Sequence, residues 1–267
     1  MRIEAGTRAI VTGASRGIGR ALCERLAKRG ARLGLVARGR DGLEELAASL
    51  PAREGADHVA LAADVGRRSD MEKAVERFVK KTGGLDLLVA NAGIAHYGPF
   101  ADVELEKAEE MVRVNVLGTL YTVSAGINQM LDHARGHVVV VSSGAGLRAF
   151  PWGAVYGGTK AFDRGFAEAL RHELSGTGVG VTTVFPGEVE TALHDHQRDR
   201  LPDWRTDENT IEAGRVADDI VAAVESDRRE VHAPRAVKLL GLNGLAPRLT
   251  DELVARARGR SAAPRRD

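Results

Sequence analysis

Short apolar runs alternate with amphipathic stretches along most of the chain. Apolar residues three and four positions apart, such as Ile18, Leu22 and Leu26, predict helices, whereas continuous aliphatic runs predict strands. The strands expected on this basis span residues 8–12, 33–37, 58–64, 85–90, 137–142, 179–185 and 229–233. The helices expected between them begin near Ile18, span 43–50, 70–81 and 103–131, and end with one that runs to about Leu174.

This alternation predicts one α/β domain over residues 1–267. Strands that are apolar at every position are buried on both faces, which indicates a parallel sheet with helices on each side. Repeated strand–helix units favour right-handed crossovers. The expected fold is a single-domain, Rossmann-like, doubly wound sheet of about seven strands. A polar substrate flap at about 192–213 and an unusual tail at about 234–267 follow the regular part.

Composition and charge narrow the class of protein. Apolar residues make up 43% and charged residues 28%, as in ordinary globular proteins, and 38 basic against 37 acidic residues give no reason to expect a nucleic-acid partner. Cys23 is the single cysteine, which excludes an intrachain disulfide and fits a reducing compartment. The sequence contains no signal-peptide pattern and no transmembrane segment, so we expect a cytoplasmic protein.

The stretch TGASRGIG, Thr12 to Gly19, lies where the first expected strand meets the first helix. Ligands of an open parallel sheet bind at the carboxyl ends of its strands. Glycines at this point let the backbone approach a pyrophosphate, and the helix N-terminus offers unpaired N–H groups. The turn therefore predicts a dinucleotide site, although its glycine spacing differs from the general G-x-G-x-x-G pattern.

A tyrosine and a lysine stand four residues apart in VYGGTK, at Tyr156 and Lys160. On a helix the two side chains share one face, a single turn apart. A free phenol has a pKa of about 10, and a neighbouring ammonium lowers it by favouring the phenolate. The pair predicts a general acid/base that works near neutral pH.

Together these motifs resemble the short-chain dehydrogenase/reductase family. TGASRGIG, ANAG at 90–93, Asn115, Ser143, YGGTK and Pro186-Gly187 occur in the order and spacing of that family, over about residues 5–192. The resemblance implies an oxidoreductase that uses NAD(H) or NADP(H) and interconverts a carbonyl and an alcohol. The catalytic residues that it implies are Asn115, Ser143, Tyr156 and Lys160, where Asn115 holds a water and Ser143 orients the substrate oxygen.

The resemblance also implies a set of cofactor contacts. The turn binds the phosphates, Asp64 and Val65 meet the adenine, and the loop after Pro186 cups the nicotinamide. The residues expected to bind the cofactor are Gly13, Ser15, Arg16, Gly17, Ile18, Gly19, Arg38, Asp64, Val65, Asn91, Ala92, Gly93, Tyr156, Lys160, Pro186, Gly187, Val189 and Thr191.

Charge predicts which nicotinamide cofactor is used. NAD-selective sites place an acidic residue at the end of the second strand to bind the ribose 2′-hydroxyl. This chain has Ala37 and Arg38 there, with Arg16 inside the glycine turn. Two guanidinium groups suit a 2′-phosphate, so we expect NADP(H), with NAD(H) the weaker alternative.

The substrate, the tail and the assembly are predicted only in outline. Leu147, Trp152 and Leu193, together with Ser143, are expected to bound an apolar substrate pocket. The sequence HDH at 194–196 lacks a further ligand cluster, so no metal site is expected. The apolar and arginine-rich tail is expected to line the entrance, pack on a partner subunit or contact a membrane surface. A homodimer or homotetramer is expected from the resemblance.

Two other functions remain open at this point. Sugar-nucleotide epimerases and dehydratases share the tyrosine–lysine pair, but they usually have a different glycine spacing and a larger C-terminal domain. An NADP-binding redox sensor would bind the cofactor without turnover. Such sensors tend to lose the tyrosine or the lysine, and this chain has both.

Overall fold

The computed structural model describes residues 1–53, 56–191, 193 and 210–244. Its centre is a seven-stranded sheet in the order β3-β2-β1-β4-β5-β6-β9, and every neighbouring pair is parallel. The strands are β1 (Arg8–Thr12), β2 (Arg32–Ala37), β3 (Val59–Ala62), β4 (Leu87–Ala90), β5 (Gly136–Val141), β6 (Val179–Pro186) and β9 (Glu230–Ala233). The predicted doubly wound parallel sheet is confirmed.

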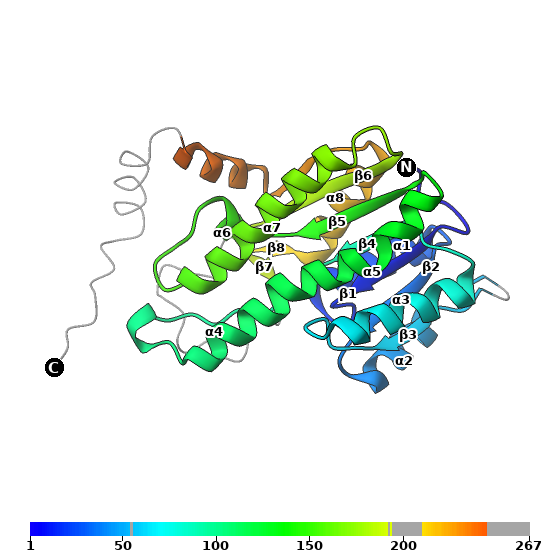
Figure 1. Ribbon diagram of the computed structural model, residues 1–267, viewed down its shortest axis with the longest axis horizontal. Helices are drawn as coiled ribbons and strands as arrows, with labels where there is room; N and C mark the ends of the chain where they lie inside the picture. Colours follow the sequence, from blue (N-terminus) through cyan, green and yellow to red (C-terminus); the bar gives the residue numbers. More distant parts are fainter. Residues whose placement is uncertain (54–55, 192, 194–209, 245–267) are drawn as a thin grey trace.

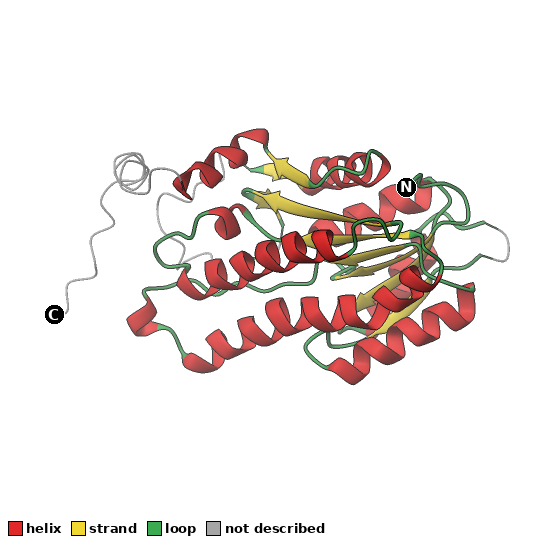
Figure 2. Ribbon diagram, turned by 45° about the horizontal axis from the view of Figure 1, so that its top comes forward, coloured by secondary structure: helices red, strands yellow, loops and turns green. Residues whose placement is uncertain are grey.

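Helices cover both faces of this sheet (Figures 1 and 2). One face carries α1 (Gly17–Lys28), α2 (Arg40–Ser49) and α8 (Ala213–Glu225), and the other carries α3 (Arg68–Thr82), α5 (Gly118–Asp132) and α7 (Ala154–Glu173). The strands divide their apolar side chains between the two layers: on β5, Val139 and Val141 pack toward α1 and α8, whereas Val138 and Val140 pack toward α5 and α7. Burial on both faces explains the continuous apolar runs.

The predicted helix at 103–131 is wrong in detail. The chain instead forms a short turn, η1 (Phe100–Asp102), then α4 (Leu105–Met111), a π-helical segment η2 (Val112–Leu117), and α5. The periodicity of apolar residues does not distinguish a π-helical segment from the α-helix on either side. The difference matters because η2 carries Asn115, and π-helical turns often occur at functional sites.

Four further elements of the structure, α8, β7, β8 and α6, were not predicted from the sequence. Helix α8 was missed although Val216, Ile220 and Val224 recur every four residues and are buried. A small sheet pairs β7 (Val189–Glu190) with β8 (Ile211–Glu212), and a short α6 (Gly144–Leu147) follows β5. The expected flap falls mostly on 192 and 194–209, outside the described residues, and so does 245–267 of the expected tail.

The described part of the tail is a helical segment, η5 (Arg235–Gly244), which lies beside α6 and β9. Side chains added at Gly144 and Gly187 would each come within 3.3 Å of Val237, so small residues let η5 pack on the ends of β5 and β6. Of the described helices, none combines the length and the apolar character needed to cross a membrane.

The strand order positions the site. From β1 the chain runs outward to β2 and β3, and then returns to β4 on the other side of β1. The connections at the carboxyl ends of β1 and β4 therefore lead to opposite sides, and a crevice opens between them.

Candidate active site

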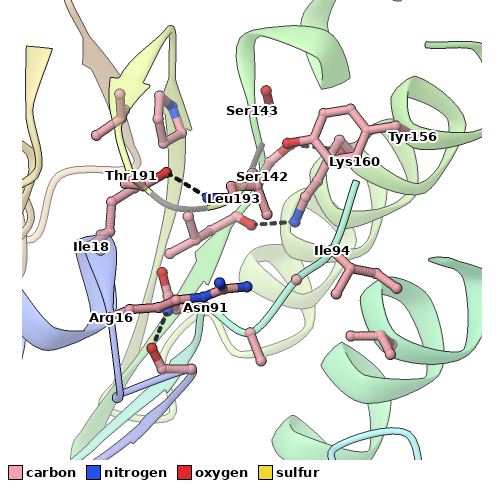
Figure 3. Close-up of a pocket in the computed structure, with 18 of the residues that line it drawn as sticks. Arg16, Ile18, Asn91, Ile94, Ser142, Ser143, Tyr156, Lys160, Thr191 and Leu193 are labelled. Carbon is pink, nitrogen blue, oxygen red and sulfur yellow. Dashed lines mark hydrogen bonds between the residues drawn. The ribbon is translucent and has the colours of Figure 1, made fainter. Parts of the chain in front are cut away.

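One cavity of about 630 Å³ lies across the carboxyl ends of the central strands. It is large enough for a drug-sized or nucleotide-sized ligand. Figure 3 shows Arg16 and Asn91 at one part of it, and Ser142, Ser143, Tyr156 and Lys160 at another. Its described lining comprises Gly13, Ser15, Arg16, Gly17, Ile18, Ala37, Arg38, Gly39, Gly42, Ala63, Asp64, Val65, Asn91, Ala92, Gly93, Ile94, Tyr97, Val114, Val141, Ser142, Ser143, Gly144, Ala145, Phe150, Tyr156, Lys160, Pro186, Gly187, Glu188, Val189, Thr191, Leu193 and Leu240.

The glycine turn needs glycine for both conformation and space. Gly13 and Gly17 have φ of 67° and 55°, which L-residues with side chains rarely adopt. A Cβ at Gly13 would lie 2.8 Å from Nδ2 of Asn91, and one at Gly17 would lie 2.9 Å from Cγ2 of Thr191. At Gly19, which does not line the cavity, a Cβ would collide with the Gly13 carbonyl oxygen. The turn is thus packed closely between β4 and the loop after β6.

Hydrogen bonds hold the turn against β4. The Thr12 hydroxyl accepts the amides of Asn91 and Ala92 at 2.9 and 3.1 Å, and Nδ2 of Asn91 donates to the Thr12 carbonyl at 2.8 Å. These bonds leave the glycine-rich segment exposed to the cavity in a fixed position. Asn91 therefore both lines the cavity and holds the glycine turn against β4.

An acid lies at the end of the cavity next to β3. The carboxylate of Asp64 accepts the Gly66 amide at 2.9 Å and Nη1 of Arg113 at 2.8 Å. Burial acts to raise the pKa of this carboxyl, but the Gly66 amide and the Arg113 guanidinium outweigh it, so the pKa is lowered. Arg113 was not predicted; an arginine two residues before Asn115 gives no sequence signal for this contact.

Both predicted arginines line the cavity. Arg16 precedes α1 at the glycine turn, and Arg38 follows β2, where its Nη1 lies 4.0 Å from Oε1 of Glu110 on α4. The Arg38 side chain is 69% exposed, so this contact is a weak surface pair. Among the described lining residues the carboxylates are Asp64 and Glu188, and neither follows β2.

The tyrosine and lysine of the expected proton-transfer site are buried on the same wall of the cavity. Tyr156 and Lys160 are 7% and 5% exposed, both on α7. Nζ of Lys160 donates to the Val141 carbonyl at 2.9 Å. Ser143 follows β5 and accepts the Ala145 amide at 3.1 Å as the N-cap of α6, which leaves its own proton free to donate. Ser142 instead donates to the Lys160 carbonyl at 2.7 Å and braces α7.

Asn115 lies behind this wall. It is fully buried and outside the cavity lining, and its Nδ2 donates to the Ile94 carbonyl at 2.9 Å and to the Thr159 hydroxyl at 3.0 Å. Its Oδ1 accepts the Ile94 amide at 2.9 Å. The side chain therefore links the loop after β4 to Thr159 of α7, which lies between Tyr156 and Lys160 in the sequence.

The wall next to Tyr156 differs from the expected substrate pocket. Leu193 lines the cavity, but Leu147 and Trp152 are not among the described lining residues. The chain forms helix α6 directly after Ser143, and Leu147 is the last residue of that helix. Trp152 has a left-handed backbone conformation, and its carbonyl oxygen accepts a hydrogen bond from the Gly98 amide. Phe150 and, from the tail, Leu240 also line the cavity, together with Ile94 and Tyr97, which were not predicted from the sequence. The Tyr97 ring packs on Tyr156 with centroids 5.6 Å apart.

Within the described ranges no group of three or more His, Cys, Asp or Glu side chains is arranged to hold a metal ion. The HDH sequence at 194–196 falls outside those ranges, so the expectation that it holds no metal stays a prediction.

Comparison with known proteins identifies the family. Residues 7–202 match the model of the short chain dehydrogenase family. An uncharacterized oxidoreductase of Listeria monocytogenes is 37% identical over 186 residues, which are 69% of this chain and 75% of that protein.

Solved structures agree on the fold. A short chain dehydrogenase of Burkholderia cenocepacia in complex with NADP has a TM-score of 0.78 and 27% identity, covering 96% of this chain and 99% of that one. A short chain dehydrogenase/reductase of Burkholderia phymatum in complex with NAD has a TM-score of 0.84 at 24% identity, covering 94% and 97%. With the glycine turn, the buried Tyr156–Lys160 pair and a family match over most of its length, this chain belongs to the short-chain dehydrogenase/reductase family of oxidoreductases.

Proposed function

We propose that this protein is an NADP(H)-dependent oxidoreductase that interconverts a ketone or aldehyde and the corresponding alcohol. The observation that carries the proposal is a single cavity with a glycine-rich turn in one part and a buried Tyr156–Lys160 pair in another. A dinucleotide cofactor would place its phosphates at the glycine turn and its reactive ring at the tyrosine–lysine pair.

The residues present fit such a cofactor. Gly13 and Gly17 line the cavity in a turn whose conformation and packing admit no Cβ, and α1 begins at this turn. A helix N-terminus at this point favours the phosphates of a dinucleotide. Gly93 leaves space in front of Lys160, because a Cβ there would lie 3.6 Å from Nζ. When bound, a nicotinamide cofactor supplies hydride chemistry, while the protein supplies position and electrostatics.

Proton transfer is assigned to Tyr156. Its phenol protonates the carbonyl oxygen in the reductive direction and takes the proton back in the oxidative one. The ammonium of Lys160, one turn away, favours the phenolate that this exchange requires. Ser143 donates its hydroxyl proton in a hydrogen bond to the same substrate oxygen, where negative charge develops. Asn115 holds the Ile94 loop and α7 at fixed positions around this site.

NADP(H) is proposed over NAD(H) because of charge at the end of β2. Arg16 and Arg38 line the cavity there, and the described carboxylates of the lining lie elsewhere. Relatives of this fold bind either cofactor: the Burkholderia cenocepacia structure holds NADP and the Burkholderia phymatum structure holds NAD. The choice must therefore come from the side chains of this chain.

The substrate is proposed to have an apolar body. The wall next to Tyr156 is built from Ile94, Tyr97, Phe150, Leu193 and, from the tail, Leu240. These side chains exclude water around the reacting oxygen and offer few hydrogen bonds to a polar ligand.

A screen with the purified protein tests the proposal. Aldehydes and ketones are supplied with NADPH, and secondary alcohols with NADP, while the nicotinamide absorbance is followed. Turnover of apolar carbonyl compounds with NADPH is the expected result. Tight NADPH binding without turnover across a broad panel would contradict it and favour the redox-sensor alternative.

A further inference from the structure

The ammonium of Lys160 has a buried anionic partner. The Lys160 side chain is 6% exposed, and Nζ donates to Oδ2 of Asp163 at 2.9 Å. Asp163 follows on α7 by three residues, so the two side chains share one face of the helix, and the Asp163 side chain is completely buried. Removing two charged groups from water costs free energy, so a completely buried ion pair is not explained in the way that a solvated surface pair is.

The other oxygen of Asp163 is held from a second helix. Thr119 of α5 places its hydroxyl 2.9 Å from Oδ1 of Asp163 and 2.8 Å from the Asn115 carbonyl. That hydroxyl has one proton, which serves one of these acceptors at a time. Contacts therefore run from Asn115 through Thr119 and Asp163 to Lys160.

We propose that Asp163 is a positioning residue for Lys160: its carboxylate keeps the buried ammonium charged and fixes it at the cavity wall, while Thr119 orients the carboxylate. This inference rests on the proposed function, because Asp163 acts through the proposed catalytic lysine and not through contact with substrate.

Hydrogen-bond counting supports the positioning role. An ammonium has three N–H donors. Val141 and Asp163 accept two of them, at 2.9 Å each, and thereby set the direction of the third. Because Lys160 lines the cavity, the remaining donor is available to a ligand there. Without Asp163 the side chain would lose one of its two fixed acceptors.

Electrostatics support the charge-keeping role. Burial favours the neutral form of a lysine and can lower its pKa by several units. An opposite charge in direct contact works against that effect. At Asp163 burial outweighs the Lys160 ammonium and the Thr119 hydroxyl, so the pKa of that carboxyl is raised. At 2.9 Å the two opposite charges nevertheless favour each other's ionised form.

The ionisable groups of the surrounding elements make other contacts. Arg113 of η2 and Glu110 of α4 lie near each other, and Arg113 pairs with Asp64. His137, near the start of β5, contacts Thr182 and Asp227. Two further ionisable side chains are the buried Arg148, directly after α6, and the Tyr156 phenol on α7. In the described part of the chain, Asp163 is the carboxylate paired with Lys160.

Titration of the lysine side chains by NMR tests the inference without turnover. With isotope-labelled lysine, the Lys160 resonance is identified by its loss in Lys160→Gln and followed against pH. Asp163→Asn keeps the shape and an acceptor oxygen but removes the charge. Its Lys160 midpoint is expected to fall by about 1–3 pH units relative to wild type.

Glu168→Gln is the matched control, since Glu168 is an exposed carboxylate on the same helix. This control should leave the Lys160 midpoint where it is in wild type. An unchanged midpoint in Asp163→Asn would overturn the inference. Such a result would leave the proposed function standing, which is tested by turnover alone; a wild type without turnover would leave the titration result standing.

Thr119→Val decides the matter if Asp163→Asn does not fold. It keeps both charges and removes the hydroxyl that orients the carboxylate, with folding checked by circular dichroism. The loosened pair should lower the Lys160 midpoint in the same direction by a smaller amount, and Thr119→Ser should restore it. A wild-type midpoint in Thr119→Val would overturn the positioning role.

Discussion

At the scale of single residues, the proposed preference for NADP(H) can be tested at Arg38, an exposed side chain. Arg38 follows β2 and lines the cavity, and its described partner is the weakly placed Glu110 at 4.0 Å. A guanidinium in this position can pair with a phosphate through charge-assisted hydrogen bonds. An aspartate in its place would repel a 2′-phosphate and accept a hydrogen bond from a 2′-hydroxyl.

Arg38→Asp is therefore expected to reverse the preference between NADPH and NADH. The lost pairing amounts to about 2 kcal/mol, so affinity for NADPH should fall about 30-fold. Dissociation constants measured by cofactor fluorescence check this. Arg40→Asp is the matched control, because Arg40 pairs with Glu44 at the surface of α2. A variant Arg38→Asp that still prefers NADPH would contradict the assignment.

Residue types with a strong chemical signature were predictable from the sequence. Tyr156, Lys160 and Ser143 were placed at one wall because their spacing and the strand–helix order determine where they lie. Asp163, Arg113 and Tyr97 were not predicted. An aspartate, an arginine or a tyrosine on a helix or loop has no distinctive spacing, and its partner is brought to it only by tertiary packing.

At the scale of elements, the glycine turn shows how backbone packing makes a binding site. Gly19 lies in α1 against the Gly13 carbonyl, and it does not line the cavity. A methyl group there would displace the turn that is proposed to bind the cofactor phosphates. Overpacking of this kind costs about 1–3 kcal/mol.

Gly19→Ala should weaken NADPH binding about tenfold, although alanine is the better helix former. Isothermal calorimetry with NADPH measures the change. Gly165→Ala is its control: on α7 a Cβ at Gly165 meets nothing within 4 Å, so this variant should bind NADPH as wild type does and melt slightly higher. Wild-type affinity in Gly19→Ala would show that the turn tolerates displacement.

The seven strands of the main sheet were predictable because their apolar runs are continuous, whereas helix α8 was missed despite its regular apolar spacing. The pattern fails where the backbone departs from a regular helix. Segment η2 differs from α4 and α5 in its π-helical backbone hydrogen bonding, which the spacing of apolar residues does not reveal. Segment η5 packs closely at Gly144 of α6 and at Gly187, and neither glycine stands in a sequence pattern that predicts this contact.

At the scale of the whole molecule, a histidine buried in the central sheet is expected to make the free energy of unfolding depend on pH. His137 of β5 is 1% exposed, and its Nε2 lies 2.8 Å from the Thr182 hydroxyl, which donates its proton to the Arg228 carbonyl at 2.6 Å. Nε2 therefore carries a proton and Nδ1 does not. Burial lowers the pKa of His137 from 6.5 to about 4.

This shift destabilises the fold in acid. Below the unfolded pKa of 6.5 the unfolded chain binds a proton that the native His137 refuses until about pH 4. The free energy of unfolding should thus fall by about 3 kcal/mol between these two pH values. Urea unfolding of wild type and His137→Gln checks it: the variant should lack this part of the pH slope.

His133→Gln supplies the comparison, because His133 is exposed near the end of α5. It should keep the wild-type slope. Equal slopes in wild type and His137→Gln would mean that the imidazole titrates normally in the native state.

The proposed activity of the protein depends on Tyr156 as the acid/base of hydride transfer. The phenol lies on α7 beside Lys160, at the wall of the cavity that the glycine turn opens into. Removing only its hydroxyl leaves the ring contact with Tyr97 and the cofactor cradle in place. Tyr121→Phe removes a phenol from α5 outside the described lining and serves as the control.

The most direct measurement is NADPH-dependent reduction of the best carbonyl substrate from the screen by wild type, Tyr156→Phe and Tyr121→Phe, with NADPH affinity measured in parallel. We expect kcat to fall by about 10²- to 10⁴-fold in Tyr156→Phe while its NADPH affinity and the activity of Tyr121→Phe stay at wild-type values. Tyr156→Phe turning over within about tenfold of wild type would contradict the assignment of Tyr156 as the proton donor.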